Sequence, residues 1–201
     1  MSAIKTGCNE YKMIEKYITN GGGLDLQMVD CFSIERNGEA TSFNPQKFGN
    51  KQLLWHGSRF SNYVGIITQG LRIAPPEAPH TGYVHGKGIY FANQIGLSFS
   101  YGCPHLSNGV GIYILAEVAL GSMGPSEGSR ATEKTLLARG FNSTHVDNSR
   151  PDPKDSTTVF GDVLVPYGKY KDNSWSNNMF IVYNPSQVRI RYLVRIKNKR
   201  T

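Results

Sequence analysis

The stretch Gly86–Tyr101, GKGIYFANQIGLSFSY, brings a permissive backbone, aromatic rings and a hydroxyl close together in the sequence. A helix over 94–101 places Ser98 three residues before Tyr101, so the two side chains share a face. A hydroxyl in that position can bond the amide of a flat ring while the tyrosine stacks on the ring itself. The plainer interpretation is a glycine-bounded core strand followed by a helix, and the segment taken alone favours it.

The elements around this stretch determine what its side chains can meet. Residues 89–91 are expected to form a short buried strand, and a second buried strand over 53–55 ends at the triplet His-Gly-Ser, 56–58. The loop 74–87 contains several prolines and glycines and predicts a semi-rigid lid over the pocket. An ordinary surface connection explains that loop equally well.

Two other helices are predicted from apolar spacing and end signals. One has Asn9 as its expected cap and runs to about Thr19, where a run of glycines stops it. The other covers 61–69 and is closed by Gly70, with three apolar side chains expected to pack inward: Val64, Ile66 and Ile67.

The remaining pattern predicts an α+β domain dominated by antiparallel sheet. Residues 109–120 are the longest strand-like run and are expected at the centre, whereas 39–50 and 121–156 predict loops. Asn37–Gly38 marks a hairpin or a sharp reversal. Further strands are expected over residues 24–36, 158–166, 180–183 and 188–196.

The composition fits one domain. The 201 residues carry 22 Lys and Arg against 15 Asp and Glu, a formal net charge of +7 that would attract polyanions. The dense basic run at 189–200 alternates with apolar residues, which indicates the solvated face of a strand rather than a nucleic-acid patch. The cysteines and histidines lack the spacing of a disulfide framework or a metal site. With no visible signal peptide or long apolar run, we expect an intracellular protein.

Four segments in order resemble a known family: LLWHGS at 53–58, GLRIAPPEAP at 70–79, TGYVHGKGIYFA at 81–92 and EVALG at 117–121. From about Tyr11 to Lys197 the chain resembles the catalytic domain of the poly(ADP-ribose) polymerases of the DNA-damage-responsive type. The resemblance implies a single catalytic domain over 1–201, without a helical regulatory subdomain or DNA-binding domain. It also implies a diphtheria-toxin-like ADP-ribosyltransferase fold, with a split, mainly antiparallel β-sheet core and flanking helices. NAD+ would be the substrate, with no metal, and the absence of a GxGxxG motif agrees with a non-redox use of NAD+.

The same resemblance implies roles for individual residues around NAD+. His56 would hold the adenine-side ribose hydroxyl, and Gly57 would bind the nicotinamide carboxamide through its backbone. Ser98 would donate to that carboxamide, while Tyr90 and Tyr101 would enclose the ring. His56 and Tyr90 are also counted as catalytic. The other binding residues would be Ser58, Arg72 beside the adenosine, Tyr83 on the loop over the ligand, and Phe91.

Two positions depart from the polymer-forming members of that family. Those members carry a glutamate just before the strand written here as FIVY, and Met179 stands in its place. Methionine offers neither a charge nor a strong acceptor, so the catalytic position lacks its acid. Leu97 stands where those relatives usually have a lysine, and Glu133, the nearest upstream glutamate, is no obvious substitute.

Two functions therefore stay open. One is a mono-ADP-ribosyltransferase that modifies a protein or another acceptor, with a glutamate supplied by a partner or by the substrate. The other is a catalytically silent module that binds NAD+ or ADP-ribose. The persistence of the nicotinamide-binding residues favours the transferase over both this module and a basic nucleic-acid-binding domain. The resemblance implies a nuclear protein if the source is eukaryotic and a cytoplasmic one otherwise. We expect a monomer that binds neither membranes nor, by this domain alone, nucleic acid.

Overall fold

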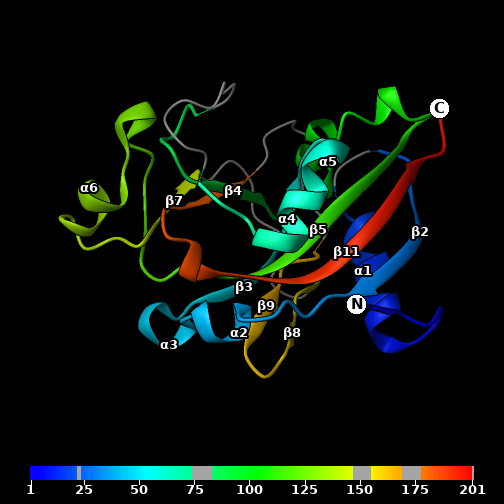
Figure 1. The fold of residues 1–201 in the computed structure, drawn as a ribbon, viewed down its shortest axis with the longest axis horizontal. Coiled ribbons are helices and arrows are strands. Elements are labelled where there is room, and N and C mark those ends of the chain that lie inside the picture. The colour runs from blue at the N-terminus through cyan, green and yellow to red at the C-terminus, as the bar shows by residue number, and fades with distance from the viewer. Residues whose placement is uncertain (22–23, 74–82, 147–154, 169–177, 201) are drawn as a thin grey trace.

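The computed structural model describes residues 1–21, 24–73, 83–146, 155–168 and 178–200. Most of the loop expected to form a lid, the glycines expected to end the first helix at 22–23, and part of the expected loop 121–156 lie outside the described residues. The part that is described forms an α+β fold built on one large, mostly antiparallel sheet (Figure 1). This confirms the fold class expected from the sequence.

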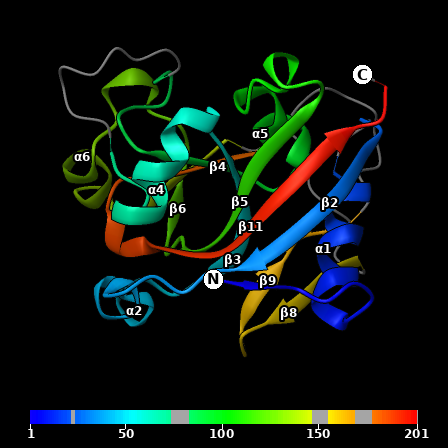
Figure 2. The ribbon, with the colours of Figure 1, turned by 45° about the vertical axis from the view of Figure 1, so that its right-hand side comes forward.

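The sheet has the order β1-β2-β11-β5-β3-β4-β10-β7-β6, and β8 and β9 branch from β3. Between the described strands, pairing is antiparallel except for β3 with β9 and β6 with β7. The strands are β1 (Ser2–Ala3), β2 (Leu26–Ser33), β3 (Lys51–Gly57), β4 (Ile89–Ala92), β5 (Val110–Ala119), β6 (Met123–Gly124), β7 (Ser143–Val146), β8 (Thr157–Val159), β9 (Val163–Val165), β10 (Met179–Val182) and β11 (Val188–Asn198). In Figure 2, β5, β11 and β2 run side by side as the long central part of the sheet.

Short helices cover this sheet. The α-helices are α1 (Asn9–Thr19), α2 (Glu39–Ser42), α3 (Pro45–Phe48), α4 (Tyr63–Gln69), α5 (Ile95–Tyr101) and α6 (Glu133–Leu137), and a 3₁₀ turn over Phe60–Asn62 leads into α4. Helix α1 lies beside β2 in Figure 2 and belongs to the same packed face as α5. Among the described residues, no helix is long and apolar enough to cross a membrane.

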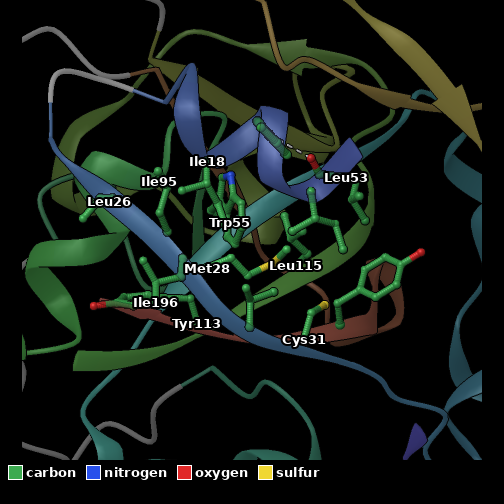
Figure 3. Packing of buried hydrophobic residues seen from close by; sticks show 14 of the residues in the cluster. Ile18, Leu26, Met28, Cys31, Leu53, Trp55, Ile95, Tyr113, Leu115 and Ile196 are labelled. Atoms are coloured by element: carbon green, nitrogen blue, oxygen red, sulfur yellow. Dashed lines mark hydrogen bonds between the residues drawn. The ribbon is translucent and has the colours of Figure 1, made fainter. Parts of the chain in front are cut away.

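Two hydrophobic clusters fill the two faces of the sheet because successive strand residues point in opposite directions. Leu53 and Trp55 join the cluster under α1 and α5, whereas Leu54 between them joins the cluster on the other face. Figure 3 shows Ile18, Trp55 and Leu115 converging in the first cluster. The long strand β5 contributes to both clusters, which confirms its expected central place.

The first helix was predicted with correct bounds but with the wrong cap. Residue Asn9 is the first helical residue, and the preceding Cys8 accepts the Tyr11 backbone N–H on its Sγ at 3.5 Å. The loop expected over 39–50 is also wrong in part, because it contains α2 and α3. The turn at Asn37–Gly38 leads into α2 and makes no hairpin, since β2 pairs with β1 and β11.

The expected packing of α4 is correct for Ile66, which packs against the core cluster, but wrong for the other two apolar residues. Val64 is 75 % exposed and Ile67 is also exposed, and the buried side chain is Tyr63, whose hydroxyl donates to the Ile112 carbonyl. The C-terminal end of α4 is held from outside the helix: the Arg36 guanidinium donates to the carbonyls of Ile67 at 2.8 Å and Thr68 at 3.0 Å. A helix of two turns held by polar contacts at its end needs only a narrow apolar stripe.

The stretch 121–146 is more ordered than the sequence suggested, since it contains β6, α6 and β7. Thr132 and Thr135 form a reciprocal capping box that starts α6, and Leu136 packs with Ile181 of β10. These elements are short, so tertiary contacts rather than local periodicity hold them in place.

Most basic side chains of β11 pair with acids on neighbouring strands or beside them. Arg195 pairs with Asp30 of β2, and Arg191 pairs through Nε, at 2.8 Å, with Glu117 of β5, which is only 3 % exposed. Arg189 and Lys199 also have acidic partners. This pairing supports the interpretation of 189–200 as a strand face rather than a nucleic-acid patch.

Candidate functional site

The described residues form an open cleft of about 1040 Å³ between β3, α4, β4 and α5, with β10 at one side. We call it the β3–α5 cleft. Every residue that the sequence suggested for binding or catalysis lies along it: His56, Gly57, Ser58, Arg72, Tyr83, Tyr90, Phe91, Ser98, Tyr101 and Met179. The structure thus brings together positions spread over more than half of the chain.

His56 stands near the end of β3 with its imidazole fixed in one tautomer. Its Nδ1 lies 2.8 Å from the carbonyl oxygen of Tyr90, and because a carbonyl only accepts, Nδ1 carries the hydrogen. The Nε2 atom is then an acceptor suited to a ligand hydroxyl. Burial lowers the pKa of His56 from its ordinary value, although its hydrogen bond to the Tyr90 carbonyl acts in the opposite direction. The ring is therefore neutral at pH 7 and also packs against the Phe91 ring, with centroids 5.7 Å apart.

Helix α5 approaches β3 closely at Gly57. A Cβ at residue 57 would lie 1.9 Å from the carbonyl oxygen of Ser98, so any side chain here would push the helix away. Ser98 itself is 4 % exposed and lines the cleft. Its hydroxyl has no hydrogen bond within the part of the chain that the structure describes. A hydroxyl without a protein partner at the wall of a cleft can bond a polar ligand group.

Aromatic rings form the rest of this end of the cleft. Tyr101, one turn after Ser98 on α5, is 54 % exposed despite its large apolar ring. The rings of Tyr83 and Tyr90 have centroids 6.1 Å apart. Burial raises the pKa of Tyr90 to about 12, so its phenol stays neutral, and its hydroxyl donates to the Gly86 carbonyl at 2.7 Å. A flat cationic ring would find electron-rich faces here.

The glycines that begin the Gly86–Tyr101 stretch make room for the protein itself. Gly86 has φ +88°, and a Cβ there would lie 2.2 Å from the Ala131 carbonyl oxygen. A Cβ at Gly88 would meet Ile181 of β10 at 2.5 Å. These close approaches let β4 pack tightly against its neighbours. The packing in turn determines the position of Tyr90.

Polar and basic side chains also line the cleft. Arg72 donates to the Gln69 side-chain oxygen at 2.6 Å, and Asn62 donates to the Ser58 hydroxyl at 2.9 Å. Arg59 is a further lining residue. Sequence reasoning missed the contribution of α4 and the turn before it, although the polar positions 62 and 69 with Ile66 between them have the spacing of one helix face.

None of the described residues that line the cleft is Asp or Glu. Glu133, considered from the sequence as a substitute acid, is not among the lining residues, and its carboxylate accepts a hydrogen bond from Asn184 at 2.9 Å. Met179, the first residue of β10, lines the cleft and pairs with Ala92 of β4 and Val146 of β7. No cluster of three metal-ligating side chains occurs among the described residues.

An α+β domain with this mainly antiparallel sheet, and with a cleft that offers acceptors, a hydroxyl, tyrosines and arginines, fits the class of ADP-ribosyltransferases that use NAD+. Comparison with known proteins defines the family. Residues 8–198 match the model of the poly(ADP-ribose) polymerase catalytic domain. The chain belongs to this family.

Curated relatives agree with this assignment. The chain is 42 % identical over 203 residues to poly [ADP-ribose] polymerase 1 of Oryza sativa subsp. japonica, which covers 94 % of this chain and 21 % of the relative. It is 40 % identical to poly [ADP-ribose] polymerase of Drosophila melanogaster over 98 % of this chain and 21 % of the relative. Poly [ADP-ribose] polymerase 1 of Gallus gallus is 42 % identical over 94 % of this chain and 20 % of the relative. The chain thus spans about a fifth of the length of these relatives.

Replacing Ser98 and Tyr101 together by Ala should abolish the thermal stabilisation that benzamide, a nicotinamide mimic, confers on the chain. A ligand that binds only the folded state raises its apparent stability, and in the nicotinamide site that the resemblance implies these two side chains would supply the amide partner and the stacking face. Melting temperatures with and without benzamide measure this. Ser100→Ala is the matched control, because Ser100 lies on the same helix and its hydroxyl bonds the Leu97 carbonyl outside the cleft. Undiminished stabilisation in the double variant would remove these residues from the site.

Acid should destabilise the wild type relative to a His56→Gln variant. Since burial holds the pKa of folded His56 below 6.5, the unfolded chain takes up a proton below that pH that the folded chain does not. Stability is therefore lost as pH falls below 6.5, and this residue adds no pH dependence above it. Urea unfolding of both proteins between about pH 7.5 and pH 5.5 measures the difference. His85, whose pKa is also lowered by burial, is present in both and cancels. A difference that stays constant with pH would contradict the neutral buried imidazole.

Proposed function

We propose that this chain is a mono-ADP-ribosyltransferase that transfers ADP-ribose from NAD+ to a protein acceptor. The observation that carries the proposal is the composition of the β3–α5 cleft: groups suited to NAD+ line it, and no carboxylate of the described residues does. Binding of NAD+ and elongation of an ADP-ribose polymer then depend on different groups. The chain supplies the groups for binding.

The lining residues suit both parts of NAD+. At the nicotinamide end, the hydroxyl of Ser98 has no protein partner in the described part of the chain, and Tyr101 exposes its ring. At the adenosine end, Arg59 and Arg72 supply positive charge for a pyrophosphate. Bound NAD+ would supply the ADP-ribosyl group, with nicotinamide as the leaving group. In this arrangement His56 accepts from a ribose hydroxyl through Nε2, and the neutral Tyr90 closes the ring site.

The missing carboxylate limits the chemistry. A positioned acid or base contributes about 10²–10⁴ in rate, through stabilisation of charge or through removal of a proton from the attacking group. With Met179 in that position, transfer would be slow unless a partner or the acceptor supplies an acid. Elongation needs a second ribose hydroxyl to be activated, so it would suffer most.

The second candidate is a catalytically silent module that binds NAD+ or ADP-ribose. The same lack of a carboxylate favours it.

Incubation with NAD+ labelled in the adenosine part separates the two candidates, with protein-bound label and free nicotinamide measured together. Label in discrete gel bands with equimolar nicotinamide supports the transferase. A high-mass smear removed by a poly(ADP-ribose)-degrading glycohydrolase would overturn the mono-specific proposal. Binding of NAD+ without either product would establish the silent module.

Met179→Glu should raise the rate of nicotinamide release from NAD+ by about a hundredfold or more. Residue 179 pairs with Ala92 and lines the cleft, so the new carboxylate would lie on the cleft side of β10. Leu97→Lys alone should change this rate little, because a group on the acceptor side helps only after cleavage of NAD+ is efficient. The double variant should therefore show a gain in rate that is more than additive. Nicotinamide release by the four proteins measures this. A flat rate with NAD+ affinity intact would show that residue 179 does not reach the reacting ribose.

A further inference from the structure

A chain of hydrogen bonds outside the cleft connects its aromatic wall to the core. Tyr183, just after β10, is 4 % exposed and donates its hydroxyl hydrogen to the His85 carbonyl at 2.6 Å. The hydroxyl of Thr144 on β7 lies 2.9 Å from the same phenol oxygen. Since the only hydroxyl hydrogen of Tyr183 goes to His85, Thr144 is the donor in this second bond.

The peptide groups of His85 are held from both sides. Its carbonyl accepts from Tyr183, and its backbone N–H donates to the Tyr90 hydroxyl at 3.1 Å. Tyr90 in turn donates to the Gly86 carbonyl. Gly86 also donates its N–H to the Tyr83 carbonyl at 3.2 Å, which closes a turn over 83–86. One turn therefore carries Tyr83 and fixes the hydroxyl of Tyr90, and both rings line the cleft.

We propose that Tyr183 is a positioning residue for the nicotinamide end of the cleft. Its hydroxyl fixes the turn 83–86, and the turn fixes the rings of Tyr83 and Tyr90. Tyr183 does not line the cleft and acts only through the His85 peptide. This inference rests on the proposed function, because it assigns the two rings to the wall of a nicotinamide site.

Geometry supports this role over a purely structural one. Tyr183 has two hydrogen-bond partners, and only one of them belongs to the turn. Thr144 is fully buried on β7, opposite Ile181 of β10, and does not line the cleft. Removing either hydroxyl breaks the bond between Thr144 and Tyr183, but only removal of the Tyr183 hydroxyl releases the turn. The two residues therefore form a matched pair for a test.

The experiment compares Tyr183→Phe with Thr144→Val in benzamide titrations by calorimetry and in urea unfolding. Both variants should lose stability, because each loses a buried hydrogen bond. Tyr183→Phe should raise the benzamide Kd about tenfold, whereas Thr144→Val should change it less than about twofold. Equal effects of the two variants on Kd, or no effect of Tyr183→Phe, would overturn the inference. Absence of benzamide binding by the wild type would instead count against the proposed function.

Tyr90→Phe provides a second arm, because it keeps the ring and removes only the hydroxyl that holds the His85 N–H. It should weaken benzamide binding as Tyr183→Phe does, and the double variant should bind about as weakly as the worse single variant, since both changes release one turn. Fully additive losses would contradict a shared turn. If Tyr183→Phe does not fold, wild-type affinity in Tyr90→Phe would by itself overturn the inference.

Discussion

The close approach of helix α5 to the end of strand β3 is the constraint on which the cleft depends. At Gly57 the Ser98 carbonyl occupies the space that a side chain would need. This contact places the α5 face bearing Ser98 and Tyr101 beside the strand that carries His56. Behind it, Trp55 of β3 and Ile95 and Phe99 of α5 pack in one buried cluster. The hydrophobic core therefore determines the spacing between an imidazole, a hydroxyl and an aromatic ring, which come from separate parts of the sequence.

The second feature that shapes the site is the distribution of charge. Outside the cleft, basic side chains of β11 have acidic partners, as Arg195 has in Asp30 and Arg191 in Glu117. Along the cleft, Arg59 and Arg72 face no acid of the described residues. Such a surface favours binding of a polyanionic ligand. It does little to stabilise the positive charge that develops on the ligand when that ligand is cleaved. The electrostatics of the cleft thus favour NAD+ binding more than they favour chemistry.

Sequence reasoning succeeded for elements whose local pattern agrees with their tertiary packing. It failed where contacts with residues distant in the sequence determine the packing. The apolar runs of β3 and β5 and the residue spacing in α1 and α5 predicted these elements, because their apolar side chains are buried in the core. Val64 and Ile67 looked like core residues, but α4 is fixed by Tyr63 and by Arg36, which lies far away in the sequence. The residues that align the aromatic wall were also missed: Tyr183 contacts His85 across 98 positions, and nothing in either residue's neighbourhood signals this bond.

Strand register explains why one substitution can separate binding from catalysis. Met179 and Ile181 point to the same side of β10, and Ile181 pairs with Tyr90 of β4. Phe180 and Val182 point to the other side and join the core cluster that contains Leu54. A shift of one residue would exchange these two faces, so the buried cluster holds residue 179 on the side of Tyr90. Packing therefore fixes the position of residue 179 on the cleft side of β10 and does not depend on the chemistry of its side chain, so methionine is accommodated there without disturbing the other residues that line the cleft.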